Sequence, residues 1–218
     1  MGHPGRRRRS LTTPFAHDER TNTAMNSTTR AKWDERYRER EVERSRAAEV
    51  LERNLHLLPA TGRALDLACG LGSNALLLAE RGLDTWAWDL SPVAVEKLRG
   101  AATRRGVALH AEVRDLADAP PTAGSFDVIV VAHFLERDLC PAIAAALRPD
   151  GLLFYQTFTR ARTDGRGPDN DHFRLAEGEL LGLFPDLALI HYHEEGLIGD
   201  TAEGLRNIAQ LIGRQSRN

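Results

Sequence analysis

The chain has 218 residues, a formal net charge of −2 and a hydrophobic fraction of 42%. This length is typical of one globular domain of about 190 residues with a tail, and the balanced charge argues against a general nucleic-acid or membrane-surface binder. Two cysteines, Cys69 and Cys140, provide no disulfide framework, and no apolar run reaches the ~18 residues of a membrane-spanning helix. We therefore expect a cytoplasmic protein without a membrane anchor.

The N-terminal residues 1–28 differ in composition from the rest of the chain. Residues 1–30 contain six arginines but only two acids, Asp18 and Glu19, among several prolines, threonines and asparagines. Few of these side chains can build a core, so we predict a disordered tail followed by one domain over residues 29–214. A transit peptide and a nucleic-acid-binding tail are the alternatives for this segment.

Two helices are expected before the first strand. The first begins at residue 29 or 30 and places Trp33 and Tyr37 four residues apart on one face. The second covers residues 43–58, where apolar side chains recur at helical spacing up to a proline. We expect residues 29–58 to form a helical cap.

Residues 63–82 carry the strongest pattern in the chain. A short apolar strand, residues 64–68, is followed by Gly70 and Gly72, and a helix begins just after them and ends at a further glycine. Ser73 or Asn74 can cap that helix. A strand, a glycine turn and a helix N-terminus form a cradle for a nucleotide, because free backbone N–H groups face the ligand.

The type of nucleotide follows from the residues around this cradle. No Lys-Ser/Thr pair follows the glycines, which excludes the usual triphosphate loop, and position 75 is alanine where a dinucleotide fingerprint has glycine. Asp66 repels a pyrophosphate but suits a ligand with an ammonium group. Asp89 ends the next apolar run and can accept hydrogen bonds from two ribose hydroxyls. Asp115, which follows a third run, can accept one from an adenine amino group.

The remaining elements alternate between strands and helices. The pattern predicts helices at residues 92–105, 138–147 and 176–184, and strands at residues 85–88, 107–113, 126–132, 151–158, 187–193 and 205–212. Such alternation indicates a parallel sheet with right-handed crossovers. The last two strands are too close for a crossover helix, so we expect them to form an antiparallel hairpin.

Five of these segments, in this order, resemble the class I S-adenosylmethionine-dependent methyltransferases over roughly residues 30–214. They are the turn at residues 66–72, Asp89, Asp115-Leu116, the strand at residues 126–133 and the turn at residues 147–153. The resemblance implies an α/β, Rossmann-like, seven-stranded and mostly parallel sheet with helices on both faces. Ala68 stands where that family more often has glycine. The cofactor-binding residues that the resemblance implies are Trp33, Asp66, Ala68, Gly70, Gly72, Asn74, Asp89, Leu90, Asp115, Leu116 and Ala132.

The acceptor of the methyl group should lie beyond the ends of the fourth and fifth strands, where open α/β sheets bind their ligands. The candidate residues there, with one from the first helix, are Tyr37, His133, Phe134, Arg137 and Arg160. His133 is a candidate general base, since imidazole titrates near neutral pH, or else a wall of the pocket. The Asn/Asp-Pro-Pro-aromatic motif of amino-group methylases and the Pro-Cys nucleophile of pyrimidine methylases are both absent.

Residues 159–175 form a long segment between the fifth strand and the next helix. We interpret it as a lid whose arginines suit an anionic acceptor, with a solvated loop of balanced charges as the alternative. Arg160 and His172, the latter beside Asp171, are further catalytic candidates. Residues 191–195 place two histidines and a glutamate on one strand face, and we interpret them as solvated and predict no metal site.

The last third of the chain, from Phe173 to Glu195, resembles the tellurite-resistance methyltransferases. The resemblance implies a methyltransferase for a small acceptor such as a thiol, an oxyanion, tellurite or selenite. An RNA methyltransferase and a protein that binds S-adenosylmethionine without transferring a methyl group are the alternatives. We expect a monomer or a homodimer, and no nucleic-acid partner.

Overall fold

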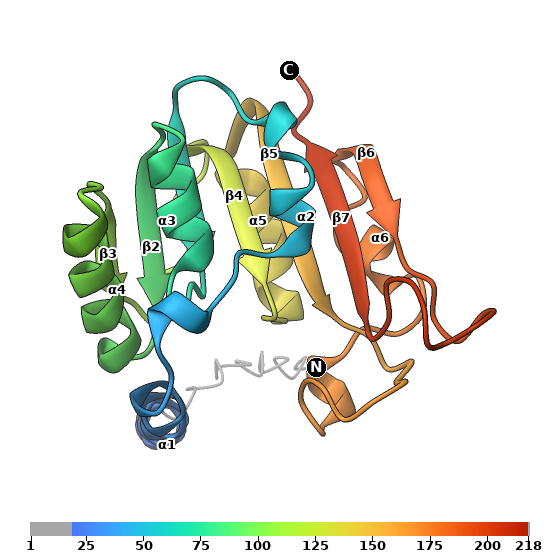
Figure 1. Ribbon diagram of the computed structural model, residues 1–218, viewed down its shortest axis with the longest axis horizontal. Helices are drawn as coiled ribbons and strands as arrows, with labels where there is room; N and C mark the ends of the chain where they lie inside the picture. Colours follow the sequence, from blue (N-terminus) through green and yellow to red (C-terminus); the bar gives the residue numbers. More distant parts are fainter. Residues whose placement is uncertain (1–18, 218) are drawn as a thin grey trace, which may run out of the picture.

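The computed structural model describes the backbone of residues 19–217 and the side chains of residues 27–217. These residues form a seven-stranded sheet (Figure 1). Its strands are β1 (Arg63–Leu67), β2 (Asp84–Asp89), β3 (His110–Val113), β4 (Phe126–Ala132), β5 (Leu147–Phe158), β6 (Ala188–His193) and β7 (Ile208–Arg214). They lie in the order β3-β2-β1-β4-β5-β7-β6. The five strands from β3 to β5 in this order are parallel to one another, and β7 pairs antiparallel with both β5 and β6. The predicted mostly parallel sheet with a terminal antiparallel hairpin is confirmed.

Helices cover both faces of this sheet. The helices are α1 (Glu19–Arg38), α2 (Glu49–Glu52), α3 (Ser73–Glu80), α4 (Pro92–Arg105), α5 (Cys140–Ala146) and α6 (Glu179–Leu183), with short 3-10 turns η1 (Val42–Arg44), η2 (Leu55–Leu57), η3 (Arg137–Leu139) and η4 (Asp171–Phe173). Figure 1 shows α2, α3 and α4 on one face and α5 and α6 on the other. No helix of residues 19–217 has both the length and the apolar character needed to cross a membrane.

The central strands are apolar throughout because both of their faces are covered. In β4, Ile129 and Val131 pack into the core cluster that contains α5 and α6 residues, while Val128 and Val130 pack into a cluster on the opposite face. All four side chains are fully buried. A strand that is buried on both faces is stabilised by apolar side chains at successive positions. This continuous apolar run is the pattern that predicted β4.

Helix α4 confirms the prediction made from its starting residues. Ser91 caps it, with Oγ accepting a hydrogen bond of 3.2 Å from the Ala94 N–H, and Pro92 occupies the first turn. Gly106 ends it with a left-handed φ of 68°.

The first helix is longer than predicted. Helix α1 begins at Glu19, so residues 19–28 are helical rather than part of a disordered tail. No proline or glycine interrupts residues 19–38, and the polar composition that suggested disorder is also compatible with a helix. The rest of the predicted tail, residues 1–18, lies outside the described residues.

The single helix predicted over residues 43–58 is wrong. The segment contains only η1, the short α2 and η2. Ala48 is extended, with φ −64° and ψ 136°, and donates its N–H to Asn74 Oδ1 at 2.8 Å. The Val50 N–H donates to Gln156 Oε1 at 3.1 Å. Side chains from the start of α3 and from β5 therefore accept hydrogen bonds from backbone N–H groups that a continuous helix would have used internally.

The starts of three other elements differ from the predicted positions by a few residues. Strand β5 begins at Leu147 rather than 151, because Leu147 already pairs with Phe126 before an irregularity in the register. Helix α6 begins three residues later than predicted, since the Ala176 N–H donates to the Glu179 side chain at 2.7 Å. Strand β3 is shorter than predicted and starts at His110.

Candidate functional site

The glycine turn, residues 68–73, connects β1 to α3 at the carboxyl edge of the sheet. Ala68, Gly70 and Gly72 all have left-handed backbones, with φ of 53°, 53° and 75°. A Cβ on Gly72 would come within 2.4 Å of the Leu98 side chain, so this position also needs glycine for space. Ala68 carries a side chain in a conformation that costs roughly 1–2 kcal/mol for residues other than glycine.

Asp66 fastens the turn to the start of α3. Its side chain is fully buried and accepts hydrogen bonds from Asn74 Nδ2 at 3.1 Å and from the Ala75 N–H at 3.0 Å. Burial raises the pKa of Asp66 to about 7, because desolvation penalises its charged form more than these bonds favour it. The expected capping by Ser73 or Asn74 is wrong: Gly72 is the N-cap, and Asn74 instead bridges Asp66 and Ala48.

Asp89 joins the glycine turn to the end of β2. One carboxylate oxygen accepts the Gly70 N–H at 2.7 Å, and the other accepts the Ser91 N–H at 2.8 Å. The side chain is buried, and burial raises its pKa above the usual value. Each carboxylate oxygen keeps a further lone pair for a ligand. Leu90, also predicted at the cofactor, is half-buried beside it.

Helix α1 lies over this turn through residues on one face. A Cβ on Gly70 would meet the Tyr37 hydroxyl at 2.8 Å, and Trp33 stacks on Tyr37 with ring centroids 5.7 Å apart. Asp34 accepts a hydrogen bond from Ser91 Oγ. Lys97 Nζ donates to the carbonyls of residues 37, 38 and 40 at 2.6–2.8 Å, which satisfies the C-terminal end of α1. Both predicted aromatic residues therefore belong to the cover of the turn.

Asp115 and Leu116 follow β3 at the same edge. The Asp115 carboxylate accepts the Ala117 N–H at 3.0 Å in a local turn, and Leu116 is buried in the core. The Arg114 N–H donates to the Asp89 carbonyl at 2.8 Å, so the segment continues directly from the residue that holds the glycine turn.

On the neighbouring strands, His133 stands at the predicted acceptor side. It follows Ala132, the last residue of β4, has a left-handed φ of 56° and is exposed. Its ring lies 5.0 Å from that of Phe158 at the end of β5. The protein packed around the ring lowers the pKa of His133, because desolvation penalises the imidazolium. Phe134 is half-buried, and its carbonyl accepts the Tyr155 hydroxyl at 2.9 Å.

The acceptor loop, residues 159–175, is held mainly by its own arginines. Arg174 is buried and donates to the carbonyls of Pro168 and Thr159 at 2.7 Å each, and to that of Arg166. Arg162 pairs with Asp171, and Arg166 pairs with Asp164. Three of the four arginines therefore serve the loop itself, as the alternative of balanced charges predicted.

The other predicted acceptor residues differ in how many hydrogen bonds and ion pairs their side chains form with the protein. Arg137 binds both oxygens of Glu179, at 2.6 and 3.1 Å, and the carbonyls of residues 172 and 174. The guanidinium of Arg160 is exposed and has no hydrogen-bond or ion-pair partner among the described residues. His172 is exposed too, and its neighbour Asp171 forms an ion pair with Arg162.

Comparison with known protein families matches residues 36–195 to a family described as methyltransferase domain. The chain belongs to this methyltransferase family. It is 36% identical over 110 residues to a ubiquinone biosynthesis O-methyltransferase of Xanthomonas axonopodis pv. citri, covering 48% of this chain and 46% of that one. It is 40% identical over 121 residues to a ribosomal protein L11 methyltransferase of Dechloromonas aromatica, covering 53% and 38%. The chain spans less than half the length of either relative.

A solved structure supports the fold of this methyltransferase domain. TehB from Haemophilus influenzae superposes with a TM-score of 0.62 at 21% sequence identity, over 77% of this chain and 62% of that one. The resemblance to class I methyltransferases drawn from the sequence is confirmed, and their cofactor is S-adenosylmethionine.

The glycine turn fits that cofactor. The buried Ser73 Oγ, at the first residue of α3, has no hydrogen-bond partner in the described part of the chain. Two buried carboxylates, Asp66 and Asp89, stand beside the turn and disfavour a pyrophosphate, while Asp89 keeps lone pairs suited to hydroxyl donors. These hydroxyl and carboxylate groups suit a ligand that combines a nucleoside with a cationic amino-acid end.

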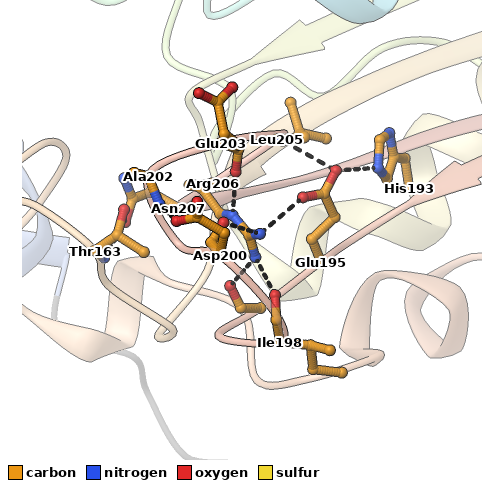
Figure 2. A network of polar contacts seen from close by, with 11 residues as sticks. Thr163, His193, Glu195, Ile198, Asp200, Ala202, Glu203, Leu205, Arg206 and Asn207 are labelled. Atoms are coloured by element: carbon orange, nitrogen blue, oxygen red, sulfur yellow. Dashed lines mark hydrogen bonds and ion pairs between the residues drawn. The ribbon is translucent and has the colours of Figure 1, made fainter.

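The sequence missed a second loop, which contacts the acceptor loop. Between β6 and β7, Arg206 donates to the carbonyls of residues 196, 198, 200 and 203 and pairs with Glu195, whose carboxylate also binds His193 (Figure 2). Asn207 accepts the Thr163 N–H at 2.6 Å and so ties this loop to the acceptor loop. Asparagine tolerates the left-handed φ of 66° found there, but no spacing in the sequence pairs Arg206 with Glu195.

Gln156 was also missed, although it had a visible signal. It is the one amide in the apolar run of β5 from residue 152 to 156, and it is buried. A buried polar side chain in an apolar strand needs hydrogen-bond partners, and it finds them on three other segments.

Proposed function

We propose that the protein transfers the methyl group of S-adenosylmethionine to a small-molecule acceptor beyond the ends of β4 and β5. The observation that carries this proposal is the arrangement of two groups on one sheet edge. Asp89 closes the glycine turn at the end of β2, and His133 and Phe158 lie against each other at the ends of β4 and β5. Ligands of open α/β sheets bind at this edge.

Each group on the cofactor side has a role that its contacts support. Asp89 binds the ribose hydroxyls, Gly70 and Gly72 let the ligand approach the backbone, and Asp66 holds the start of α3 in place. Tyr37 covers the turn from α1. S-adenosylmethionine, when bound, supplies a methyl group on a sulfonium sulfur, a leaving group that needs no protonation. Alignment alone can then contribute about 7–11 kcal/mol.

The acceptor that suits the other side is a thiol, an oxyanion or a tellurite- or selenite-like anion. The guanidinium of Arg160, which has no hydrogen-bond or ion-pair partner among the described residues, supports an anionic acceptor, and the aromatic pair His133–Phe158 gives it an uncharged wall. Phe134 and Tyr37 complete the proposed acceptor side. The two relatives described above are named for different processes, ubiquinone biosynthesis and methylation of ribosomal protein L11, so this choice rests on the residues of the site.

We also infer that the protein acts in the cytoplasm as a monomer or homodimer. Its two cysteines, Cys69 and Cys140, are both buried and unpaired, which suits a reducing compartment.

The proposal is tested by calorimetric titration of the purified protein with S-adenosylmethionine and, separately, with NAD. Radiolabelled methyl transfer to a panel of thiols, tellurite, selenite and bulk RNA then follows. We expect micromolar binding of S-adenosylmethionine alone and transfer to a small acceptor that drops in Arg160→Ala without weaker cofactor binding. Transfer to RNA alone, or tight binding with no transfer to any acceptor, would contradict the small-molecule proposal.

A further inference from the structure

The side-chain amide of Gln156 has a fixed orientation. Gln156 lies in β5 and is 4% exposed. Its Oε1 accepts the Val50 N–H at 3.1 Å and Gln210 Nε2 at 2.8 Å. A backbone N–H can only donate, so the atom that faces Val50 must be the amide oxygen. The NH₂ group of Gln156 therefore points the other way.

That NH₂ group faces the ring of His133. Gln156 Nε2 lies 3.5 Å from His133 Nε2. The backbone N–H of His133 donates to the backbone carbonyl of Gln156 at 2.8 Å, which fixes the two residues side by side. The ring of Phe158, 5.0 Å away, packs on the imidazole. Because the amide NH₂ is a donor only, it is satisfied only by an imidazole whose Nε2 carries no proton.

We infer that Gln156 is a positioning residue that holds His133 as the neutral Nδ1–H tautomer, so that His133 offers the acceptor an N–H donor and not a base. Nδ1 has no hydrogen-bond partner in the described part of the chain, and the ring is exposed, so this N–H is available to a ligand. A donor suits an acceptor that carries a lone pair on an oxygen or sulfur and arrives already deprotonated.

The surroundings of the ring agree with a neutral imidazole. Its contacts, Gln156 and Phe158, are uncharged, and so are Val50 and Gln210, which hold Gln156 in turn. Desolvation by the protein packed on one side of the ring lowers the pKa of His133, and no carboxylate contacts the ring among the described residues to favour an imidazolium. The assignment to catalysis rests on the proposed function, whereas the tautomer does not.

Long-range proton–nitrogen NMR of the full chain reads the tautomer directly, because protonated and unprotonated ring nitrogens resonate far apart. The His133 signals are identified as those lost in His133→Phe. We expect one tautomer, with the proton on Nδ1, and a His133 pKa below the usual value of 6.5 for histidine. A proton on Nε2, or a mixture of both tautomers, would overturn the inference.

Two variants separate orientation from packing. In Gln156→Glu an acceptor oxygen replaces the donor, so the proton should move to Nε2 and the His133 pKa should rise. Gln156→Leu removes the donor to His133, together with the acceptor of the Val50 N–H and of Gln210 Nε2, and a mixture of tautomers is expected. An unchanged His133 spectrum in both folded variants would refute the role of Gln156, and the wild-type spectrum decides the tautomer if either fails to fold.

The catalytic part is read from the pH dependence of kcat/KM with an oxyanion or thiolate acceptor. We expect no inflection from His133 in the wild type and a new one in Gln156→Glu. A wild-type inflection at the NMR-measured pKa of His133, with activity rising as it loses its proton, would make His133 a base and contradict the inference. Absence of methyl transfer to any acceptor would instead remove the proposed function and leave the tautomer result standing.

Discussion

The glycine turn and the acceptor loop lie on the same edge of the sheet but are held by opposite charges. In the glycine turn, the carboxylates of Asp66 and Asp89 accept backbone N–H groups. In the acceptor loop, the guanidinium of Arg174 donates to backbone carbonyls. Both solutions satisfy buried peptide groups that have no partner in regular structure.

The difference matters because only one of these charges titrates. A carboxyl group takes up a proton when burial raises its pKa, whereas a guanidinium stays charged throughout the working range of pH. The short turn on the cofactor side is therefore sensitive to pH, and the long loop on the acceptor side is not. Four experiments test this contrast.

Asp89→Ala should have the largest effect. It removes the acceptor of two backbone N–H groups, from Gly70 and Ser91, together with the proposed ribose partner. We expect binding of S-adenosylmethionine to weaken by about 4 kcal/mol, roughly a thousandfold, as measured by calorimetry. The control is Asp84→Ala, which removes an exposed acid from the other end of β2. Equal affinities for both variants would show that Asp89 has no part in the cofactor site.

The pH dependence of the free energy of unfolding should show the cost of burying the charged form of Asp66. Between the usual pKa of 3.8 and the folded value of about 7, the native protein holds a proton that the unfolded chain releases. Stability contributed by this group is therefore present at low pH and is lost as pH rises toward 7, by about 4 kcal/mol in total.

Urea titrations of the wild type and Asp66→Asn at several pH values isolate this contribution. The asparagine does not titrate, so the difference in unfolding free energy between the two proteins should change steadily from pH 4 to pH 7. A difference that is constant over this range would mean that Asp66 is charged in the native protein.

Arg174→Ala should loosen the acceptor loop and leave the glycine turn unchanged. The carbonyls of residues 159, 166 and 168 lose their donor, at a cost of about 2 kcal/mol. Amides of residues 160–173 should exchange with solvent roughly thirtyfold faster, while cofactor binding stays the same. Arg166→Ala, which removes only an exposed ion pair, is the matched control. Weaker cofactor binding in Arg174→Ala would show that the two regions are coupled.

Ala68→Gly should have the smallest effect and should be favourable. Glycine relieves the strain of a left-handed alanine, and its greater freedom in the unfolded chain offsets part of that gain, leaving about 0.5 kcal/mol of stabilisation. The reverse change in the same turn, Gly70→Ala, should destabilise, because the new Cβ would meet the Tyr37 hydroxyl at 2.8 Å. A less stable Ala68→Gly protein in urea unfolding would show that Ala68 is not strained.

The sequence predicted the elements whose causes are local. Alternating apolar runs located the strands, and Ser91-Pro92 and Gly106 located the ends of α4. Residues 43–58 failed because the amides of Ala48 and Val50 bind side chains that are 26 and 106 residues away. Helical spacing in a sequence carries no information about such partners.

Within the site, the sequence located acids better than arginines. Asp66 and Asp89 stand at strand ends, where the pattern already gives their position. Four arginines of the acceptor loop looked equivalent, yet Arg174 is buried and Arg160 is exposed. Which arginine goes inside depends on which loop carbonyls lack a partner, and that is decided only when the loop has folded.

The position of β7 has a consequence for how the chain is made. It leaves the ribosome after the other six strands of this sheet, yet it lies between β5 and β6. Until residues 208–214 are synthesised, β5 has an unpaired edge and β6 has no strand to join. An exposed strand edge is a site for pairing with other chains. Nascent or truncated chains should therefore depend on chaperones and aggregate readily, even though the parallel half of the sheet can already form.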